Sequence, residues 1–263
     1  MIKIYDKNDT FIAELKYDEE FYSNYAKHSH DMLSLTAIKS GEIDIEFHSY
    51  KSEVLKEKHI AVFNPHQVHK STNKSKNTYG YFVLYFDEAW CIKLQNQIFD
   101  NQNTFYPIHI NIIEDKEQNK TFLKLCEDIL KSKNPYTQIE KFMLDIFKNY
   151  AKEDTRISKN SLAKEVKEYI LNTSEQISLD DIAKKFSYSK EHIIRSFKKE
   201  FGLSPHAFLL DSKVKKAKKD LNTNYEINLS DIALEHGFYD QSHFSKNFKK
   251  VYATNPNAYK LDK

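Results

Sequence analysis

Three histidines in the first part of the chain are the residues best suited to chemistry. His28 and His30 are separated by one residue, and His69 lies further along. Alternate side chains on a β-strand share a face, so a His-x-His pair on a strand can place two imidazoles on one divalent ion. No glutamate follows His30 at a short spacing, because Glu42 is twelve residues further on. A metal site and ordinary packing or ligand hydrogen bonding are therefore both open.

The rest of the chain contains no set of residues typical of catalysis. Cys91 and Cys126 lack a paired spacing, which predicts reduced, buried thiols. The sequence shows no nucleophile–His–acid set, phosphate-binding loop or Cys/His zinc spacing. It also has neither a signal peptide nor an apolar run near the roughly 20 residues that span a bilayer. We therefore expect a cytoplasmic protein that is not an enzyme, has no cofactor and has no membrane partner.

The elements that must position the histidines are strands. Up to about Asp115, short runs of branched and aromatic residues alternate with Gly, Pro and polar clusters, which predicts β structure. The clearest runs are Leu33–Ile38, Ile43–Phe47, His59–Phe63 and Tyr79–Phe86. Strands at this spacing favour a barrel or a sandwich.

A change to helical periodicity follows at about Gln118. One apolar stripe begins at Phe122 and a second includes Phe142 and Ile146, and Asn134-Pro135 separates them. This pattern predicts a helical hairpin that ends near Lys152. The hairpin could cover the barrel, form a dimer contact, or do both with different faces.

The charge is unevenly divided along the chain. Residues 1–160 hold 22 Lys and Arg against 24 Asp and Glu, whereas residues 161–263 hold 18 against 14, a local net charge of +4. Between the two parts lies a polar stretch at residues 153–160, which we expect to be a linker. A basic C-terminal part favours a polyanionic partner.

A repeat organises this C-terminal part. The segment from Ile177 to Ala183 recurs fifty residues later as the segment from Ile227 to Ala233. One inserted residue follows, and then Phe197-Lys-Lys recurs as Phe248-Lys-Lys. A unit of this length that occurs twice indicates two duplicated small domains.

Each copy has the parts of a helix-turn-helix. Ser178 and Asn228 are expected N-caps, and an acid follows each three residues later. Ser189 and Asp240 are the expected caps of a second helix, and Gly237 supplies the positive φ that a tight turn needs. The alternative is a helical bundle that merely has charged faces, which matched caps and turns in two copies disfavour.

The outer face of each second helix is polar and basic. It comprises Lys190, Glu191, Arg195 and Lys199 in the first copy, and Gln241, Ser242, Ser245, Lys246 and Lys249 in the second. Short hydrogen-bonding side chains near a helix start, with basic ones further on, suit a helix that reads the major groove between phosphate contacts.

A long helix is expected between the copies, from Ser204-Pro205 to about Asn222. Such a helix would hold the two reading helices about one turn of DNA apart. Its five lysines fit a solvated face, and phosphate contacts by one or two of them are the second interpretation. They are Lys213, Lys215, Lys216, Lys218 and Lys219.

The second copy closely resembles the signature of the AraC/XylS family of regulators. The matching residues are those from Asp231 to Phe238, those from Asp240 to Lys250, and Asn255-Pro256. The resemblance implies base contacts by Glu191, Ile194 and Arg195 in the first reading helix, and by Gln241, Ser242, Ser245 and Lys246 in the second. Ile194 could touch a thymine methyl, and Glu191 could accept from a cytosine amine.

The N-terminal part resembles the cupin-like sensor domain of such regulators. The matching residues are the three from His28 to His30, the segment from Gly41 to Ile45 and the segment from Phe63 to His69. The resemblance implies a small effector bound near His28, His30 and His69 without a metal. A metal-dependent cupin enzyme that carries a DNA-binding tail is the alternative function.

These patterns together predict an α+β protein of two domains. Residues 1–117 form a cupin-like β-barrel sensor and 118–152 a helical hairpin. Residues 153–160 form a linker, and 161–263 form an all-α DNA-binding domain with two helix-turn-helix motifs joined by a long helix. The resemblance implies a homodimeric transcription regulator, more often an activator, whose partners are double-stranded DNA, a small effector and RNA polymerase.

Overall fold

The computed structural model describes most of the chain. The described residues are 2–7, 10–20, 27–47, 52–74, 78–100, 103–131, 133–153, 161–173, 177–223, 228–252 and 255–261. Two compact units result: the first holds residues 1–24, 30–156 and 262–263, and the second holds residues 25–29 and 157–261. The expected linker at 153–160 lies almost wholly outside the described residues. No described helix is long and apolar enough to cross a membrane.

Strands of the first unit form two antiparallel sheets. The larger sheet has the order β1 (Ile2–Lys7), β2 (Thr10–Glu20), β8 (Tyr79–Phe86), β3 (Leu33–Ser40), β6 (Ile60–Phe63) and β9 (Ile112–Ile113). The smaller has the order β5 (Ser52–Lys56), β4 (Glu42–Phe47) and β7 (His69–Asn73). The chain passes from the larger to the smaller sheet at Gly41, whose φ is 95°. The two sheets fit the expected cupin-like domain, but the barrel is not closed, because no hydrogen-bonded strand ladder joins them among the described strands.

The burial of each strand explains its sequence. Strand β4 alternates buried and half-buried residues, as one covered face requires, whereas β6 and seven of the eight residues of β8 are buried. All four predicted strand runs are confirmed, as β3, β4, β6 and β8. One helix was not expected in this part. Helix α1 (Glu88–Gln95) begins where the Asp87 carboxylate accepts the backbone N–H of Trp90 at 2.8 Å.

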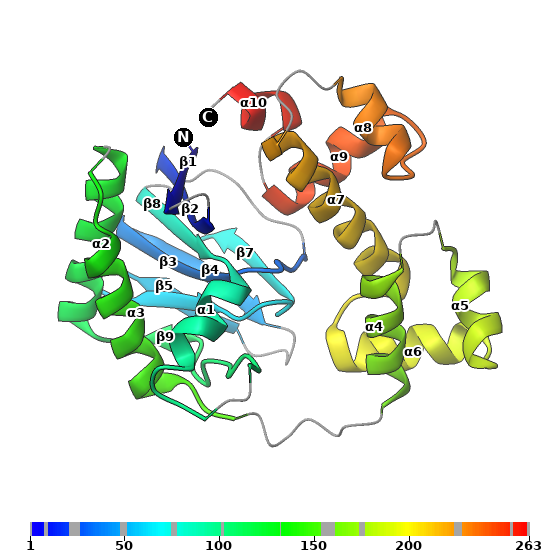
Figure 1. Ribbon diagram of the computed structural model, residues 1–263, viewed down its shortest axis with the longest axis horizontal. Coiled ribbons are helices and arrows are strands. Elements are labelled where there is room, and N and C mark those ends of the chain that lie inside the picture. Colours follow the sequence, from blue (N-terminus) through cyan, green and yellow to red (C-terminus); the bar gives the residue numbers. More distant parts are fainter. Residues whose placement is uncertain are drawn as a thin grey trace. The chain divides into compact units, whose positions relative to one another are not determined.

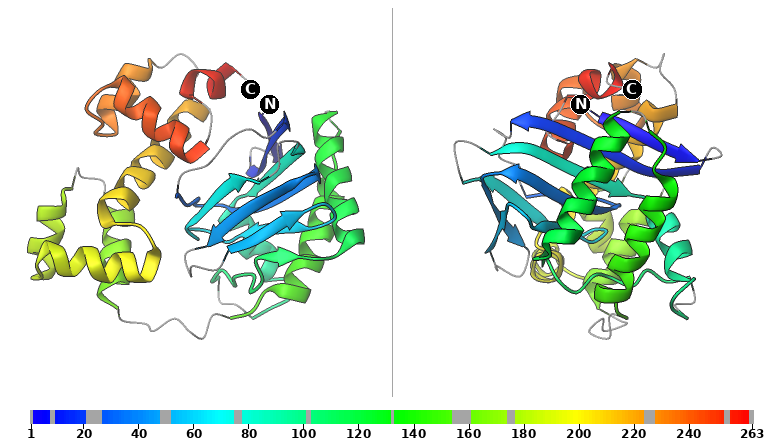
Figure 2. Two further views of the ribbon diagram at one scale, coloured as in Figure 1. Left: turned by 180° about the vertical axis from the view of Figure 1, so that it is seen from behind. Right: turned by 90° about the vertical axis from the view of Figure 1, so that its left-hand side faces the viewer.

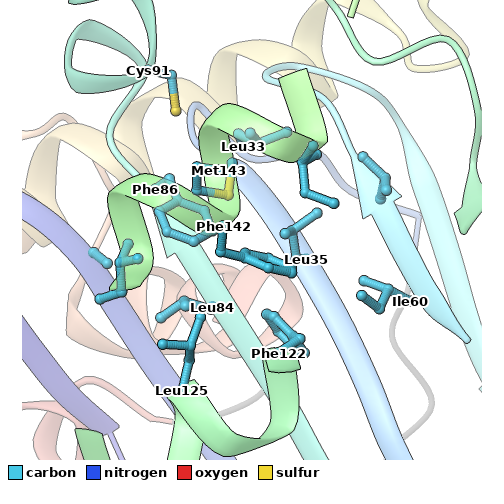
Figure 3. Close-up of a cluster of buried hydrophobic side chains, with 14 of the residues drawn as sticks. Leu33, Leu35, Ile60, Leu84, Phe86, Cys91, Phe122, Leu125, Phe142 and Met143 are labelled. Carbon is cyan, nitrogen blue, oxygen red and sulfur yellow. The ribbon is translucent and has the colours of Figure 1, made fainter. Parts of the chain in front are cut away.

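The predicted helical hairpin is confirmed as α2 (Lys116–Leu130) and α3 (Tyr136–Tyr150). Its apolar stripes pack on the larger sheet, where Phe122 and Phe142 lie beside Leu35 and Leu84 (Figure 3). Figure 2 shows the two helices over one face of that sheet. Both cysteines are buried and free, and burial raises the pKa of each thiol well above its usual value.

The stripe of α3 has no exposed share. Phe142 is 6% exposed and Ile146 is 0% exposed, so both belong to the core of the unit. The apolar face of the hairpin therefore covers the larger sheet of its own unit. Any contact between copies through α3 would use its polar outer face.

Helices make up the second unit, apart from the short segment at residues 25–29. They are α4 (Leu162–Asn172), α5 (Leu179–Phe186), α6 (Lys190–Phe201), α7 (Pro205–Thr223), α8 (Leu229–Glu235), α9 (Gln241–Tyr252) and α10 (Pro256–Leu261). Helix α7 runs between the two helix-turn-helix units, with α4 and α6 packed at one end and α8, α9 and α10 at the other (Figure 1). The expected long connecting helix is thus present.

The lysines of α7 form only part of the solvated face that we expected, because Lys216 and Lys219 are exposed whereas Lys215 and Lys218 are buried. Lys213 donates to the carbonyl of Gly237 at 3.1 Å, and Lys216 donates to the carbonyl of Thr173 at 2.8 Å. Lys218 is buried, with its ammonium 4.6 Å from the centre of the Tyr252 ring. A long side chain can bury its stem and still reach a polar group, which is why charge alone did not predict this arrangement.

A buried acid completes the polar contacts of α7. Asp211 accepts from the backbone N–H of Ser29 at 3.2 Å and from its hydroxyl at 3.4 Å, and Lys215 donates to the same hydroxyl. Burial raises the pKa of Asp211 from 3.8 to about 6, against the opposing effects of the Lys215 charge and the Ser29 hydrogen bonds. Inside the fold the protonated carboxyl is therefore the more stable form up to about pH 6.

This raised pKa predicts a pH-dependent stability. The stabilising contribution of protonated Asp211 is complete below pH 3.8 and is lost as the pH rises through about 6. A rise from pH 5 to 7.5 should therefore lower the free energy of unfolding by about 1 kcal/mol. We expect the Asp211→Asn variant to lack this part of the slope, measured by urea unfolding followed at 222 nm. Identical slopes for the variant and the wild type would contradict the assignment.

Candidate nucleic-acid interface

Both helix-turn-helix units start from hydrogen-bonded caps. Ser178 and Asp181 form a reciprocal capping box at α5, and Asn228 accepts from the N–H of Ser230 at the start of α8. The second helices are capped in the same way. Ser189 accepts from the N–H of His192 at 3.2 Å, and Asp240 accepts from that of His243 at 2.6 Å. The four predicted caps are confirmed.

The turns and the buried faces also agree with the repeat. Gly237 has φ 70°, and in the first copy Ser187 takes the left-handed conformation at φ 57°. The inward side chains of α6 and α9 are fully buried. They are Ile193 and Phe197 in the first copy, and Phe244 and Phe248 in the second. Each reading helix is therefore anchored by its apolar face and presents the opposite face outward.

The first residue of each reading helix contacts the helix before it. The Lys190 ammonium forms an ion pair with Asp180, which raises the pKa of Lys190. At the equivalent place in the second copy, the Ser230 hydroxyl donates to the Gln241 side-chain oxygen at 2.9 Å. A polar contact thus links the two helices at the same place in both copies. It also engages two residues that the sequence analysis assigned to DNA.

The remaining predicted contact residues lie along the outward faces. Those that are exposed are Glu191, Arg195, Lys199, Ser242, Lys246 and Lys249, and those that are half-buried are Ile194 and Ser245. Arg195 has one guanidinium nitrogen 3.5 Å from Nδ1 of His192. The structure therefore gathers the predicted residues on two helix faces of the second unit.

Two tyrosines and two histidines beside these faces were missed. Tyr188 and Tyr239 immediately precede the caps of α6 and α9 and are 49% and 88% exposed. The Tyr188 ring stacks on His192 with centroids 4.8 Å apart, and the backbone N–H of Tyr239 lies 3.4 Å from Nδ1 of His243. The repeat could have revealed these residues, because a tyrosine, the N-cap residue and a histidine recur at the same spacing in both copies.

Two of the three predicted histidines form a second candidate site. His30 and His69, both in the first unit, are buried, and their ring centroids lie 5.0 Å apart. His28 is also buried but belongs to the second unit. His69 begins strand β7, whereas His28 and His30 precede β3 instead of lying on it. Within the first unit, the structure thus brings together two of the three residues that the sequence singled out, His30 and His69. Glu42 lies elsewhere, close to Lys56 and Lys74.

Two protein families match this chain. Residues 182–261 match a helix-turn-helix domain, and residues 16–153 match the AraC-like ligand binding domain. Duplicated helix-turn-helix units behind a ligand-binding unit define a DNA-binding transcription regulator. The second match covers more than half of the chain, and the chain belongs to the AraC family.

Relatives and solved structures agree with this family. The uncharacterized HTH-type regulator YdiP of Escherichia coli is 33% identical over 116 residues, which are 43% of this chain but only 38% of YdiP. The HTH-type transcriptional activator AarP of Providencia stuartii is 32% identical over 114 residues, 43% of this chain and 83% of AarP. Apo ToxT from Vibrio cholerae shares the fold, with a TM-score of 0.62 at 14% identity over 97% of this chain and 99% of ToxT. A ToxT structure with bound unsaturated fatty acid has a TM-score of 0.59 at 15% identity, over 98% of this chain and 97% of that one.

The cap of the second reading helix predicts a measurable stability effect. Asp240→Ala removes the acceptor for the first turn of α9, and we expect a loss of roughly 1 kcal/mol of unfolding free energy. Asp240→Asn keeps an acceptor and should stay near the wild type. Urea unfolding of the intact chain compares the three proteins. Equal losses in both variants would show that the carboxylate has another function.

Proposed function

We propose that this regulator recognises specific DNA sites through α6 and α9 and activates transcription by contacting RNA polymerase. In this proposal a small effector bound by the N-terminal unit controls it, and it acts in the cytoplasm. The observation that carries the proposal is the pair of equivalent reading helices held on one connecting helix. Activation is the function named for the relative AarP.

The exposed residues of the reading helices divide into two groups. Arg195 and Lys246 occupy the middle of the outward faces of α6 and α9, with side chains long enough to reach a guanine edge. Lys199 and Lys249 lie further along the helices, where contact with phosphates is favoured. Sequence-specific binding requires residues that face the groove in the middle of a reading helix and basic residues further along it.

The effector site in this proposal lies at His30 and His69 of the N-terminal unit. Both residues are buried, with ring centroids 5.0 Å apart, so they provide hydrogen-bonding groups inside an apolar unit, as small-molecule sites require. The alternative function, a metal-dependent enzyme with a DNA-binding tail, has no support in the matched families. We propose that the protein is not an enzyme.

The division of the reading residues predicts different effects of two substitutions. Arg195→Ala removes a side chain able to make two parallel hydrogen bonds to guanine. It should cost roughly 1–3 kcal/mol at the best site and relax preference at one or two base pairs. Lys249→Ala should weaken binding to all sequences alike and lower the salt slope by about one.

Binding to a library of single-base variants of the best site, at two salt concentrations, measures both effects. The library is first selected from random DNA with the wild-type protein. A uniform loss for Arg195→Ala across the library would make Arg195 a phosphate contact and overturn its assignment. If the wild-type protein selected no DNA site from the random DNA, the proposed function itself would be overturned.

A homodimer through α3 is a further part of the proposal. With the apolar stripe of α3 buried, the outer face offers Lys141, Asp145 and Lys148, all exposed and of alternating sign. Two antiparallel copies of such a face can pair opposite charges. The contact would be polar and therefore sensitive to salt.

This dimer predicts an effect of charge reversal. Lys141→Glu combined with Lys148→Glu makes the outer face of α3 uniformly negative and should raise the dimer dissociation constant by about tenfold or more. Sedimentation measures the mass, and circular dichroism checks the fold. Exposed Lys93 lies on α1, so Lys93→Glu serves as the control. A wild type that stays monomeric at high concentration, with and without effector, would rule the dimer out.

A further inference from the structure

We propose that Tyr188 and Tyr239 are two further DNA-contacting residues, and that each phenol hydroxyl donates a hydrogen bond to a backbone phosphate beside its reading helix. This inference rests on the proposed function of α6 and α9 and deepens it. Contacts to phosphate fix the register of a protein on the duplex, whereas contacts to base edges read the sequence. The two tyrosines therefore place the reading helices, and the residues that follow them read the bases.

The two tyrosines occupy equivalent positions in the repeat. Tyr188 immediately precedes Ser189, the cap of α6, and Tyr239 immediately precedes Asp240, the cap of α9. The N-terminal part of a reading helix contacts base edges in the major groove. The residue before the cap therefore lies at the rim of the groove, where the phosphates are. The duplicated unit carries a phenol at this place twice.

Packing within the unit does not account for the exposure of these rings. An apolar residue before a helix cap commonly packs on the fourth residue of that helix. Here the fourth residues are Ile193 and Phe244, both 0% exposed, yet Tyr188 remains 49% and Tyr239 88% exposed. No described residue accepts a hydrogen bond from either phenol hydroxyl. Each hydroxyl is therefore available as a donor to DNA.

In the first copy, a histidine holds the tyrosine ring. The rings of Tyr188 and His192 stack with centroids 4.8 Å apart and 14° between their planes. His192 is the third residue of α6, and its backbone N–H donates to the cap hydroxyl of Ser189 at 3.2 Å. A ring already stacked on the first turn of the helix has less freedom to lose when it contacts DNA, which lowers the entropy cost of the contact.

In the second copy, the equivalent histidine holds the main chain of the tyrosine. The backbone N–H of Tyr239 donates to Nδ1 of His243 at 3.4 Å, and the His243 ring meets the buried Phe238 ring edge-on at 5.5 Å. Tyrosine and histidine are four residues apart in both copies. The same pair of residues thus ties the tyrosine to the first turn of each reading helix, through two different contacts.

The surroundings of the tyrosines favour a polyanion as the partner. Arg195 and Lys246 are exposed on the outward faces of the same helices, and residues 161–263 carry a local net charge of +4. These charges attract DNA to α6 and α9, and the tyrosine hydroxyl is among the side-chain groups that donate to phosphate. Asp240 is an acid beside Tyr239, but its carboxylate accepts the N–H of His243 at the start of α9.

Removal of the hydroxyl alone tests the contact in the intact protein. Tyr188→Phe and Tyr239→Phe keep the ring, and each should weaken binding to the best selected site by about fivefold, the value of one hydrogen bond. The loss should be the same for all single-base variants of the site. It should leave the salt slope unchanged, because a neutral hydroxyl displaces no counterion.

A third tyrosine is the matched control. Tyr79 in the first unit is 41% exposed, and its hydroxyl donates to a carboxylate oxygen of Glu19 at 3.4 Å. Tyr79→Phe should bind DNA as the wild type does. Circular dichroism compares the fold of the three variants with that of the wild type.

A scan with single methylphosphonates, each of which replaces one charged phosphate of the site, identifies the phosphate that is contacted. The wild type should lose affinity at several positions. Each tyrosine variant should lose its sensitivity at one of these positions, and that position should differ between Tyr188→Phe and Tyr239→Phe.

The possible outcomes separate this inference from the proposed function. Folded variants that bind the best site as tightly as the wild type, or that respond to every methylphosphonate as the wild type does, would overturn the phosphate contact while the proposed function stands. Unchanged DNA binding together with weaker activation of transcription would assign the tyrosines to a protein partner and equally refute the contact. A wild type that selects no site from random DNA would instead overturn the proposed function, and this inference with it.

Discussion

The packing of both helix-turn-helix units on α7 is the constraint on which the second unit depends. Val214, Ala217 and Leu221 form the buried apolar side of this helix. Two of its lysines also make polar contacts with the elements that pack on it. Lys213 contacts the turn of the second copy, and Lys216 contacts the end of α4. One continuous helix of 19 residues therefore sets the distance between α6 and α9. Two reading helices fixed at one separation can select a site longer than either could read alone.

Within each copy, polar contacts complement the apolar anchor. The buried aromatic residues of α6 and α9 hold each helix against the unit. The pairs Lys190 with Asp180 and Gln241 with Ser230 lie at equivalent places and add a polar contact to the preceding helix. Because both pairs are at the helix start, the middle of each outward face remains available for DNA. The repeat thus preserves an arrangement of contacts even where the residue types differ.

In the N-terminal unit, the helical hairpin and the larger sheet enclose one apolar core (Figure 3). Beside this core, the turn from Asn64 to Gln67 positions His69 by hydrogen bonds, in addition to the stacking of its ring on Phe63. Such bonds set both the orientation and the tautomer of the ring.

The sequence by itself determined the elements whose signals are local. Alternation predicted β4, the stripes of Phe122 and Phe142 predicted the hairpin, and the repeat predicted both helix-turn-helix units with their caps. These predictions succeed because a cap, a turn glycine or a periodic stripe acts on its immediate neighbours.

Tertiary structure alone decided that the strands form two sheets, that Phe142 and Ile146 belong to the core, and that Lys215 and Lys218 are buried. Sheet closure depends on pairing between distant strands, and a lysine is buried only when a distant polar or aromatic group receives its charge. His30 and His69 show both levels, since their types were visible in the sequence but their approach to one another required the turn before β7, whose His66 N–H donates to the His30 carbonyl.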